Sequence, residues 1–92
     1  SNFNILIYTK KVIPYLKAII AIKLINNRNF TQYEVAKLLG ITQAAVSQYL
    51  RKGEQYYIEL LSKIGLEPKD YIDGIEKVIE EVDVISDIID FF

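Results

Sequence analysis

A chain of 92 residues, 51% of them hydrophobic, can bury one modest core and therefore predicts a single small globular unit. It has no cysteine and no histidine, which argues against a disulfide framework, the commonest metal ligands and the commonest general base. No signal peptide is visible and no apolar run approaches the length of a membrane span. The net charge is −1. From the missing signal peptide, membrane span, cysteine and histidine we expect a cytoplasmic protein with no membrane contact, no metal and no cofactor.

The first 30 residues predict a central helix that follows an ambiguous segment. Residues 3–9, FNILIYT, form a short apolar run, for which periodicity leaves open an extended arm or a helical turn that continues into the next segment. Pro14 suits the first turn of a helix, where its missing N–H costs nothing. The helix predicted from about Ile13 to Asn26 is apolar around much of its circumference, which indicates core scaffold rather than a binding stripe.

Residues 31–40 predict a short helix that ends at a turn. Thr31 and Glu34 have the spacing of a capping box at its start. Gly40 ends it, because a residue without Cβ readily takes the left-handed conformation. The apolar residues with helical spacing, which we expect to face inward, are Val35, Ala36, Leu38 and Leu39.

A second short helix is predicted immediately after the turn. Thr42 is a favourable N-cap, and Gly53 lies just past the other end. Its inward residues are Val46, Tyr49 and Leu50. A pair of short helices joined by such a turn is a helix-turn-helix or, as the simpler alternative, a generic helical hairpin.

The segment TQYEVAKLLGITQAAVSQYLRK, residues 31–52, resembles the helix-turn-helix of the Cro/repressor-like (phage-repressor) family. Ala36, Gly40 and Val46 have the offsets of its small residue, its corner glycine and its β-branched residue. The run ITQAAVSQYL preceded by QYEVA is also similar to the N-terminal module of predicted archaeal transcription regulators. The resemblance covers roughly residues 12–53 and implies an all-α, repressor-like domain that binds double-stranded DNA.

The exposed face of the second helix is the candidate base-reading surface. Glutamine can pair with both the N6 and N7 positions of adenine, and alanine can contact a thymine methyl group. The resemblance implies that helix 43–51 lies in the major groove, where the first two positions and the sixth read bases. These positions are Gln43, Ala44 and Gln48, and Ser47, between groove and phosphate, completes the predicted base-reading set. The alternative is that the two glutamines are ordinary solvated side chains.

Phosphate contacts are predicted beside this face. Gln32 matches a family position whose side chain and backbone N–H hold a phosphate at the positive end of a helix. Arg51 and Lys52 would bind phosphates without reading sequence. The two N-caps, Thr31 and Thr42, complete the predicted phosphate set, although we expect the main role of Thr31 to be structural.

Residues 54–64 predict a further helix, with Gly65 closing it and Leu66 folding back onto it. Its expected packing side consists of Tyr57, Ile58, Leu60, Leu61 and Ile64. Tyr56 and Tyr57 fit the edge of the core as well as they fit a contact surface.

The last segment, which Pro68 opens, predicts a long helix with an a/d heptad seam. The seam residues, spaced alternately 4 and 3 apart, are Tyr71, Ile75, Val78, Val82, Ile85, Ile89 and Phe92. Further isoleucines (Ile72, Ile79 and Ile88) widen the apolar face, so we expect this helix to pack on its own domain and on a second copy. The alternative is that it only completes the core of a monomer. In the resembled archaeal group the module is commonly followed by other sequence, from which this helix departs, so an effector is not predicted.

The net charge conceals a division along the chain. Residues 1–53 contain eight basic residues against Glu34 alone, a balance of +7, and residues 54–92 contain three against eleven acidic ones, a balance of −8. A basic half that holds the helix-turn-helix is the electrostatic pattern of a duplex binder. The acidic half should face away from DNA.

Together these patterns predict an all-α, four- to five-helix repressor-like domain over residues 1–66 and a dimerisation helix over residues 67–92. We expect a homodimeric transcription regulator that binds a two-fold symmetric operator. The alternative from another class is a protein-docking module of the antitoxin or adaptor type. Catalysis is not predicted, because the carboxylate pairs near Asp70 and Glu80 lie on an acidic helical face with no nucleophile or phosphate loop nearby in sequence.

Overall fold

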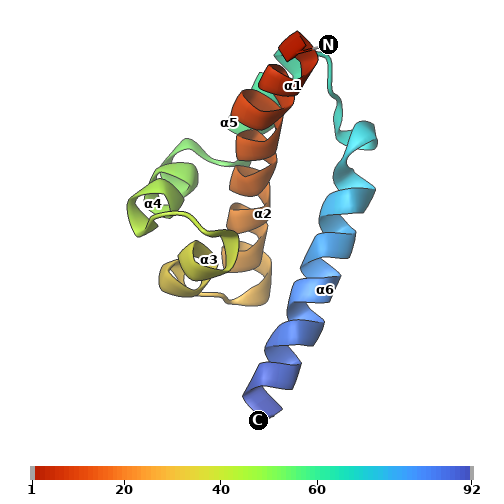
Figure 1. Ribbon diagram of the computed structural model, residues 1–92. Coiled ribbons are helices and arrows are strands. Elements are labelled where there is room, and N and C mark those ends of the chain that lie inside the picture. Colours follow the sequence, from red (N-terminus) through yellow and green to blue (C-terminus); the bar gives the residue numbers. More distant parts are fainter. Residues whose placement is uncertain (1, 92) are drawn as a thin grey trace.

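The computed structural model describes residues 2–91, which form an all-α structure around one long helix (Figure 1). The elements in chain order are α1 (Asn2–Ile7), η1 (Tyr8–Val12), α2 (Ile13–Arg28), α3 (Gln32–Leu39), α4 (Gln43–Lys52), α5 (Glu54–Lys63), η2 (Pro68–Asp70) and α6 (Ile72–Phe91). The predicted all-α class is confirmed. No helix in this described range is both long enough and apolar enough to cross a membrane.

The N-terminal segment continues directly into the central helix, so the helical alternative for residues 3–9 is correct and the extended arm is wrong (Figure 1). Pro14 therefore lies inside a continuous helical run, not at the beginning of one. Immediately before it, η1 is a π-helical turn, in which the Ile13 N–H donates to the Tyr8 carbonyl five residues earlier. The wider turn lies where proline removes the next α-helical hydrogen bond and its ring crowds the preceding turn.

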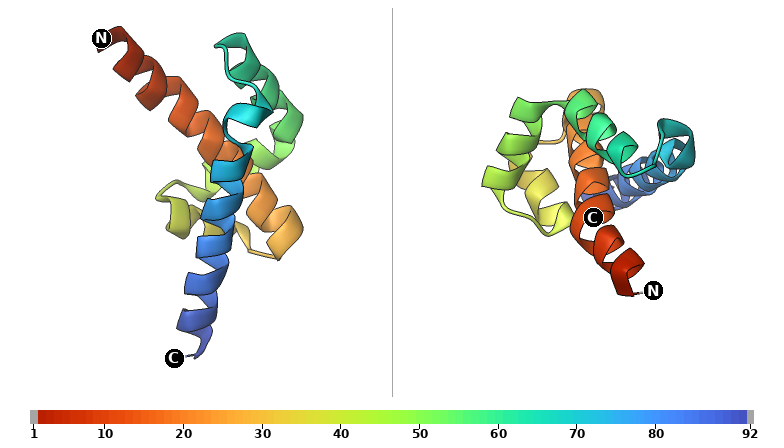
Figure 2. Two further views of the ribbon diagram at one scale, coloured as in Figure 1. Left: turned by 90° about the vertical axis from the view of Figure 1, so that its right-hand side faces the viewer. Right: turned by 90° about the horizontal axis from the view of Figure 1, so that it is seen from above.

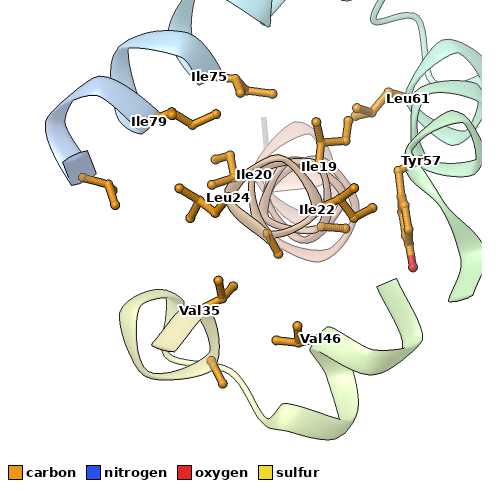
Figure 3. Packing of buried hydrophobic residues seen from close by; sticks show 14 of the residues in the cluster. Ile19, Ile20, Ile22, Leu24, Val35, Val46, Tyr57, Leu61, Ile75 and Ile79 are labelled. Atoms are coloured by element: carbon orange, nitrogen blue, oxygen red, sulfur yellow. The ribbon is translucent and has the colours of Figure 1, made fainter. Parts of the chain in front are cut away.

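Helix α2 forms the centre of the core, as its all-round apolar sequence predicts. Ala18, Ile19, Ala21 and Leu24 are fully buried. Figure 3 places Val35 and Val46 on one side of α2, Tyr57 and Leu61 on a second, and Ile75 and Ile79 on a third. Because each neighbour covers a different side, almost no face of α2 is left for binding.

Helix α5 ends as predicted. Gly65 has φ +94°, and the Leu66 N–H donates to the Leu61 carbonyl at 2.9 Å, closing a Schellman-type turn. Ile64, expected on the packing side, is exposed instead because it follows the last turn of α5.

Helix α6 packs on α2 through only part of its apolar surface. Ile75, Ile79 and Val82 are buried, and the Arg28 guanidinium binds the Asp83 carboxylate at 2.7 Å beside them. The predicted seam is therefore divided: Ile75 and Val82 are buried and Tyr71 is half-buried. The remaining described seam residues, Val78, Ile85 and Ile89, are exposed. Phe92 lies outside the described residues.

Candidate nucleic-acid interface

The helix-turn-helix begins with a complete capping box. The Thr31 hydroxyl accepts from the Glu34 N–H at 3.1 Å, and the Thr31 N–H donates to the Glu34 carboxylate at 2.9 Å. The bond from the Thr31 N–H to the carboxylate, and after it hydrogen bonding from the Thr31 side chain, lower the pKa of Glu34 because they stabilise its charged form. The predicted structural role of Thr31 is thus confirmed, while Gln32 beside it is exposed.

Gly40 ends α3 in the left-handed conformation, with φ +66°. The Ile41 N–H donates to the Ala36 carbonyl at 3.0 Å, which fixes the turn into α4. Val35 and Ala36 are buried as predicted. Leu38 is exposed, contrary to the prediction, because α3 directs it away from α2 toward a groove beside α6.

Helix α4 is fixed at its start and along its inner face. The Thr42 hydroxyl accepts from the Ala45 N–H at 3.0 Å, which makes Thr42 the predicted N-cap. Val46 is fully buried and points toward α2 (Figure 3). Tyr49 and Leu50 are half-buried against the core, as expected. Burial raises the pKa of the Tyr49 phenol, and its ring meets that of Tyr57 edge-on with 5.7 Å between centroids.

The opposite face of α4 is open to solvent. Three of the four predicted base-reading residues are exposed on it, namely Gln43, Ala44 and Gln48. Since Val46 and Tyr49 hold the backbone from behind, these short side chains are presented by a rigid helix. A helix positioned in this way can offer donors, acceptors and a methyl group to the edges of base pairs.

Ser47 is half-buried at the edge of this face, and its hydroxyl accepts from Nη1 of Arg51 at 3.0 Å. The sequence predicts both residues as part of the site but not the bond between them. Their four-residue spacing on one helix would have indicated that the two side chains can meet. The bond directs the guanidinium along the α4 face.

Lys52 is held by a contact that crosses the boundary between two helices. Its ammonium lies 5.0 Å from the centre of the Tyr56 ring, a cation–π distance. Tyr56 in turn packs edge-on against buried Tyr57 with 5.0 Å between centroids. Tyr56 is therefore a supporting residue of the site, and Tyr57 belongs to the core.

The charges of the chain are separated in space as well as in sequence. In Figure 1 and in the view from above in Figure 2, α4 and the acidic α6 lie on opposite sides of α2. Two ion pairs are present among residues 4–89, the part of the chain whose side chains are described, Lys23–Glu54 at 3.0 Å and Arg28–Asp83 at 2.7 Å. Within that part of the chain, neither Arg51 nor Lys52 is neutralised by a carboxylate.

Among residues 4–89, whose side chains the structure describes, no three His, Cys, Asp or Glu residues cluster as metal ligands would.

Residues 22–56 match the sequence model of the helix-turn-helix family, a span that contains the whole of α3 and α4. No curated protein and no solved structure matches the chain. The match supports the helix-turn-helix over the generic helical hairpin, and it supports DNA binding as the use of this surface.

Proposed function

We propose that this chain, with its helix-turn-helix between residues 22 and 56, binds double-stranded DNA at specific sequences and regulates transcription as a homodimer. The observation that carries the proposal is the solvent-facing side of α4. It combines exposed Gln43, Ala44 and Gln48 with two adjacent cations, on a helix whose other side is buried. The similarity to archaeal regulator modules belongs to the same proposal.

Base reading is assigned to the first half of α4. With α4 in the major groove, Gln43 and Gln48 each pair with the N6 and N7 positions of an adenine, and Ala44 contacts a thymine methyl group. Their alignment on one exposed face supports this assignment, because a single insertion of the helix brings all three to base edges.

Phosphate contacts hold the helix in register. Arg51 and Lys52 extend from the last turn of α4, supported by Ser47 and Tyr56. The N-cap hydroxyls of Thr31 and Thr42 and the side chain of Gln32 lie at helix starts, where backbone N–H groups and the helix dipole favour a phosphate. Each hydroxyl already accepts a bond from its own helix and keeps its proton to donate.

A homodimer is proposed because one helix reads only a few base pairs. Two copies related by a two-fold axis read two half-sites about one helical turn apart, which multiplies the specificity. The exposed apolar residues of α6 supply unpartnered surface for such an assembly.

Replacing Ser47 by alanine should weaken binding to all duplexes about equally, by about 0.5–1 kcal/mol, because Arg51 loses the hydrogen bond that orients it. The salt dependence should keep its slope, since no charge is removed. Fluorescence anisotropy at several salt concentrations measures both quantities. Ser47→Thr keeps the hydroxyl and is the matched control. A changed base preference in Ser47→Ala would show instead that Ser47 reads a base.

Selection of bound duplexes from a random DNA pool at near-physiological salt tests the function directly. We expect an enriched site composed of two inverted copies of one short sequence. A single unrepeated half-site would retain DNA binding and exclude the symmetric dimer. Failure to enrich any sequence with folded protein would reject the proposal in favour of a protein-docking module.

A further inference from the structure

The N-terminal arm, defined here as residues 4–12 of α1 and η1, carries apolar side chains that the domain does not cover. Ile5, Leu6 and Tyr8 are 61%, 52% and 54% exposed, although Ile7 and Val12 on the other side of the arm pack toward the core. In Figure 2 the arm extends away from the other helices. Exposed apolar residues grouped in this way indicate a surface that meets another one.

The α6 tip, defined as residues 78–89, carries a second uncovered apolar surface. Val84, Ile85, Ile88 and Ile89 are each more than half exposed. Beside the tip, a groove of about 400 Å³ runs between α3 and α6. Its apolar lining consists of Phe30, Tyr33, Leu38, Val82, Ile85 and Ile89.

The two surfaces are complementary in charge. The arm contains Lys10 and Lys11 and no acidic residue, and both lysines are exposed. The α6 tip contains Glu80, Glu81, Asp83 and Asp87 and no basic residue. The Arg28 guanidinium already pairs with Asp83. Pairing of two α6 tips with each other would bring the other three carboxylates together, whereas pairing of the tip with the arm places lysines beside them.

The two surfaces also agree in length and in placement. At 1.5 Å per helical residue the arm is about 14 Å long and the tip about 18 Å. The arm lies at one end of the elongated molecule and the tip at the other (Figure 1), across a longest dimension of 44 Å. An arm therefore cannot cover the tip of its own chain.

We propose that the occupant is a second copy of this chain, whose arm packs against the α6 tip and the adjacent groove. A two-fold axis perpendicular to the long dimension reverses the second molecule, so that each arm meets the tip of the other copy. The contact forms twice and uses no residue of the proposed DNA-binding set. It specifies the dimer on which the proposed function rests, and it replaces pairing of two α6 seams with reciprocal exchange of N-terminal arms.

Two charge-reversal variants test this arrangement. The arm variant is Lys10→Glu with Lys11→Glu, and the tip variant is Glu81→Lys with Asp87→Lys. The arm variant places like charges across both contacts, and the tip variant cancels the net charge of the tip and sets two lysines against the lysines of the arm. In each variant the dimer dissociation constant should therefore rise on the order of ten- to a hundred-fold. An equimolar mixture should recover much of the lost affinity as a heterodimer, because one contact is wild type on both sides and in the other the introduced glutamates face the introduced lysines. Analytical ultracentrifugation without DNA measures all three samples.

The matched control, Lys63→Glu with Lys69→Glu, makes the same charge change at exposed positions away from both surfaces and should remain dimeric. Circular dichroism checks that every variant is folded. A monomeric wild type overturns the proposal, as does a mixture that fails to reassociate. Unchanged or tighter association of the tip variant, together with an unaffected arm variant, would indicate pairing between α6 helices and would also overturn the proposal.

These measurements distinguish a failure of the proposed dimer from a failure of the proposed DNA binding. If mixing restores the dimer while no duplex is ever selected, the arm exchange holds and the proposed function is wrong. If the dissociated variants still bind a half-site duplex but mixing has no effect, DNA binding holds and the arm exchange is wrong.

Discussion

Gln43→Ala is expected to weaken binding to the selected operator by about 1–3 kcal/mol for each half-site, through loss of a two-bond contact to one base. The loss should be confined to one base pair per half-site, so that operators already changed at that position bind wild type and variant almost equally. Gln43 is exposed at the first position of α4, and the substitution leaves the Thr42 cap intact. A panel of single-base operator variants, titrated at fixed salt, locates the affected position.

Lys52→Ala is the control for this experiment, because it removes a proposed phosphate contact from the other end of the same helix. Binding should weaken about equally for all sequences, and the slope of log affinity against log salt should become shallower by about 0.9 per site occupied. If Gln43→Ala and Lys52→Ala behave alike on every operator, the assignment of base reading to Gln43 is wrong.

Leu61→Ala is expected to lower the free energy of unfolding by about 2–5 kcal/mol, because it opens a cavity where α5 packs on α2. Leu61 is 0% exposed. The whole free energy of unfolding of a domain of this size is only about 5–15 kcal/mol. The variant should therefore be partly unfolded or close to it near body temperature. Urea denaturation followed by circular dichroism gives the change in free energy.

Leu38→Ala is the matched control, since it makes the same substitution at a position that is 43% exposed. It should lower the free energy of unfolding by less than about 1 kcal/mol. The measurement is made at a concentration that keeps the chain monomeric, because Leu38 lines the proposed dimer groove. An equal loss in both variants would contradict the difference in burial.

The local architecture of the site could be predicted from sequence because neighbouring residues determine it. Each cap acts within one or two turns of its own position. The structure contains the expected capping box of Thr31 and Glu34, the expected helix end at Gly40 and the expected N-cap at Thr42. The central position of α2 could also be predicted from sequence, because a helix that is apolar on all sides is stable only when other helices surround it. The match over residues 22–56 agrees with the motif found there.

Other features depended on how distant segments meet, and sequence periodicity carries no information on crossing angles. The contact of Lys52 with Tyr56 spans Gly53 and exists only at the angle that α4 makes with α5. The course of residues 3–9 was likewise decided by their continuation into α2 through the π turn before Pro14.

The sequence by itself determined the helices, their caps and turns, the exposed polar face of α4 and the separation of charge along the chain. Only the tertiary structure decided how α6 distributes its apolar residues, with Ile75, Ile79 and Val82 on α2 and Ile85 and Ile89 in solvent. The physical reason is that a wide apolar stripe fits several packing directions nearly equally well. Helices α3, α4 and α5 already cover the other sides of α2, so α6 packs on the one side that remains.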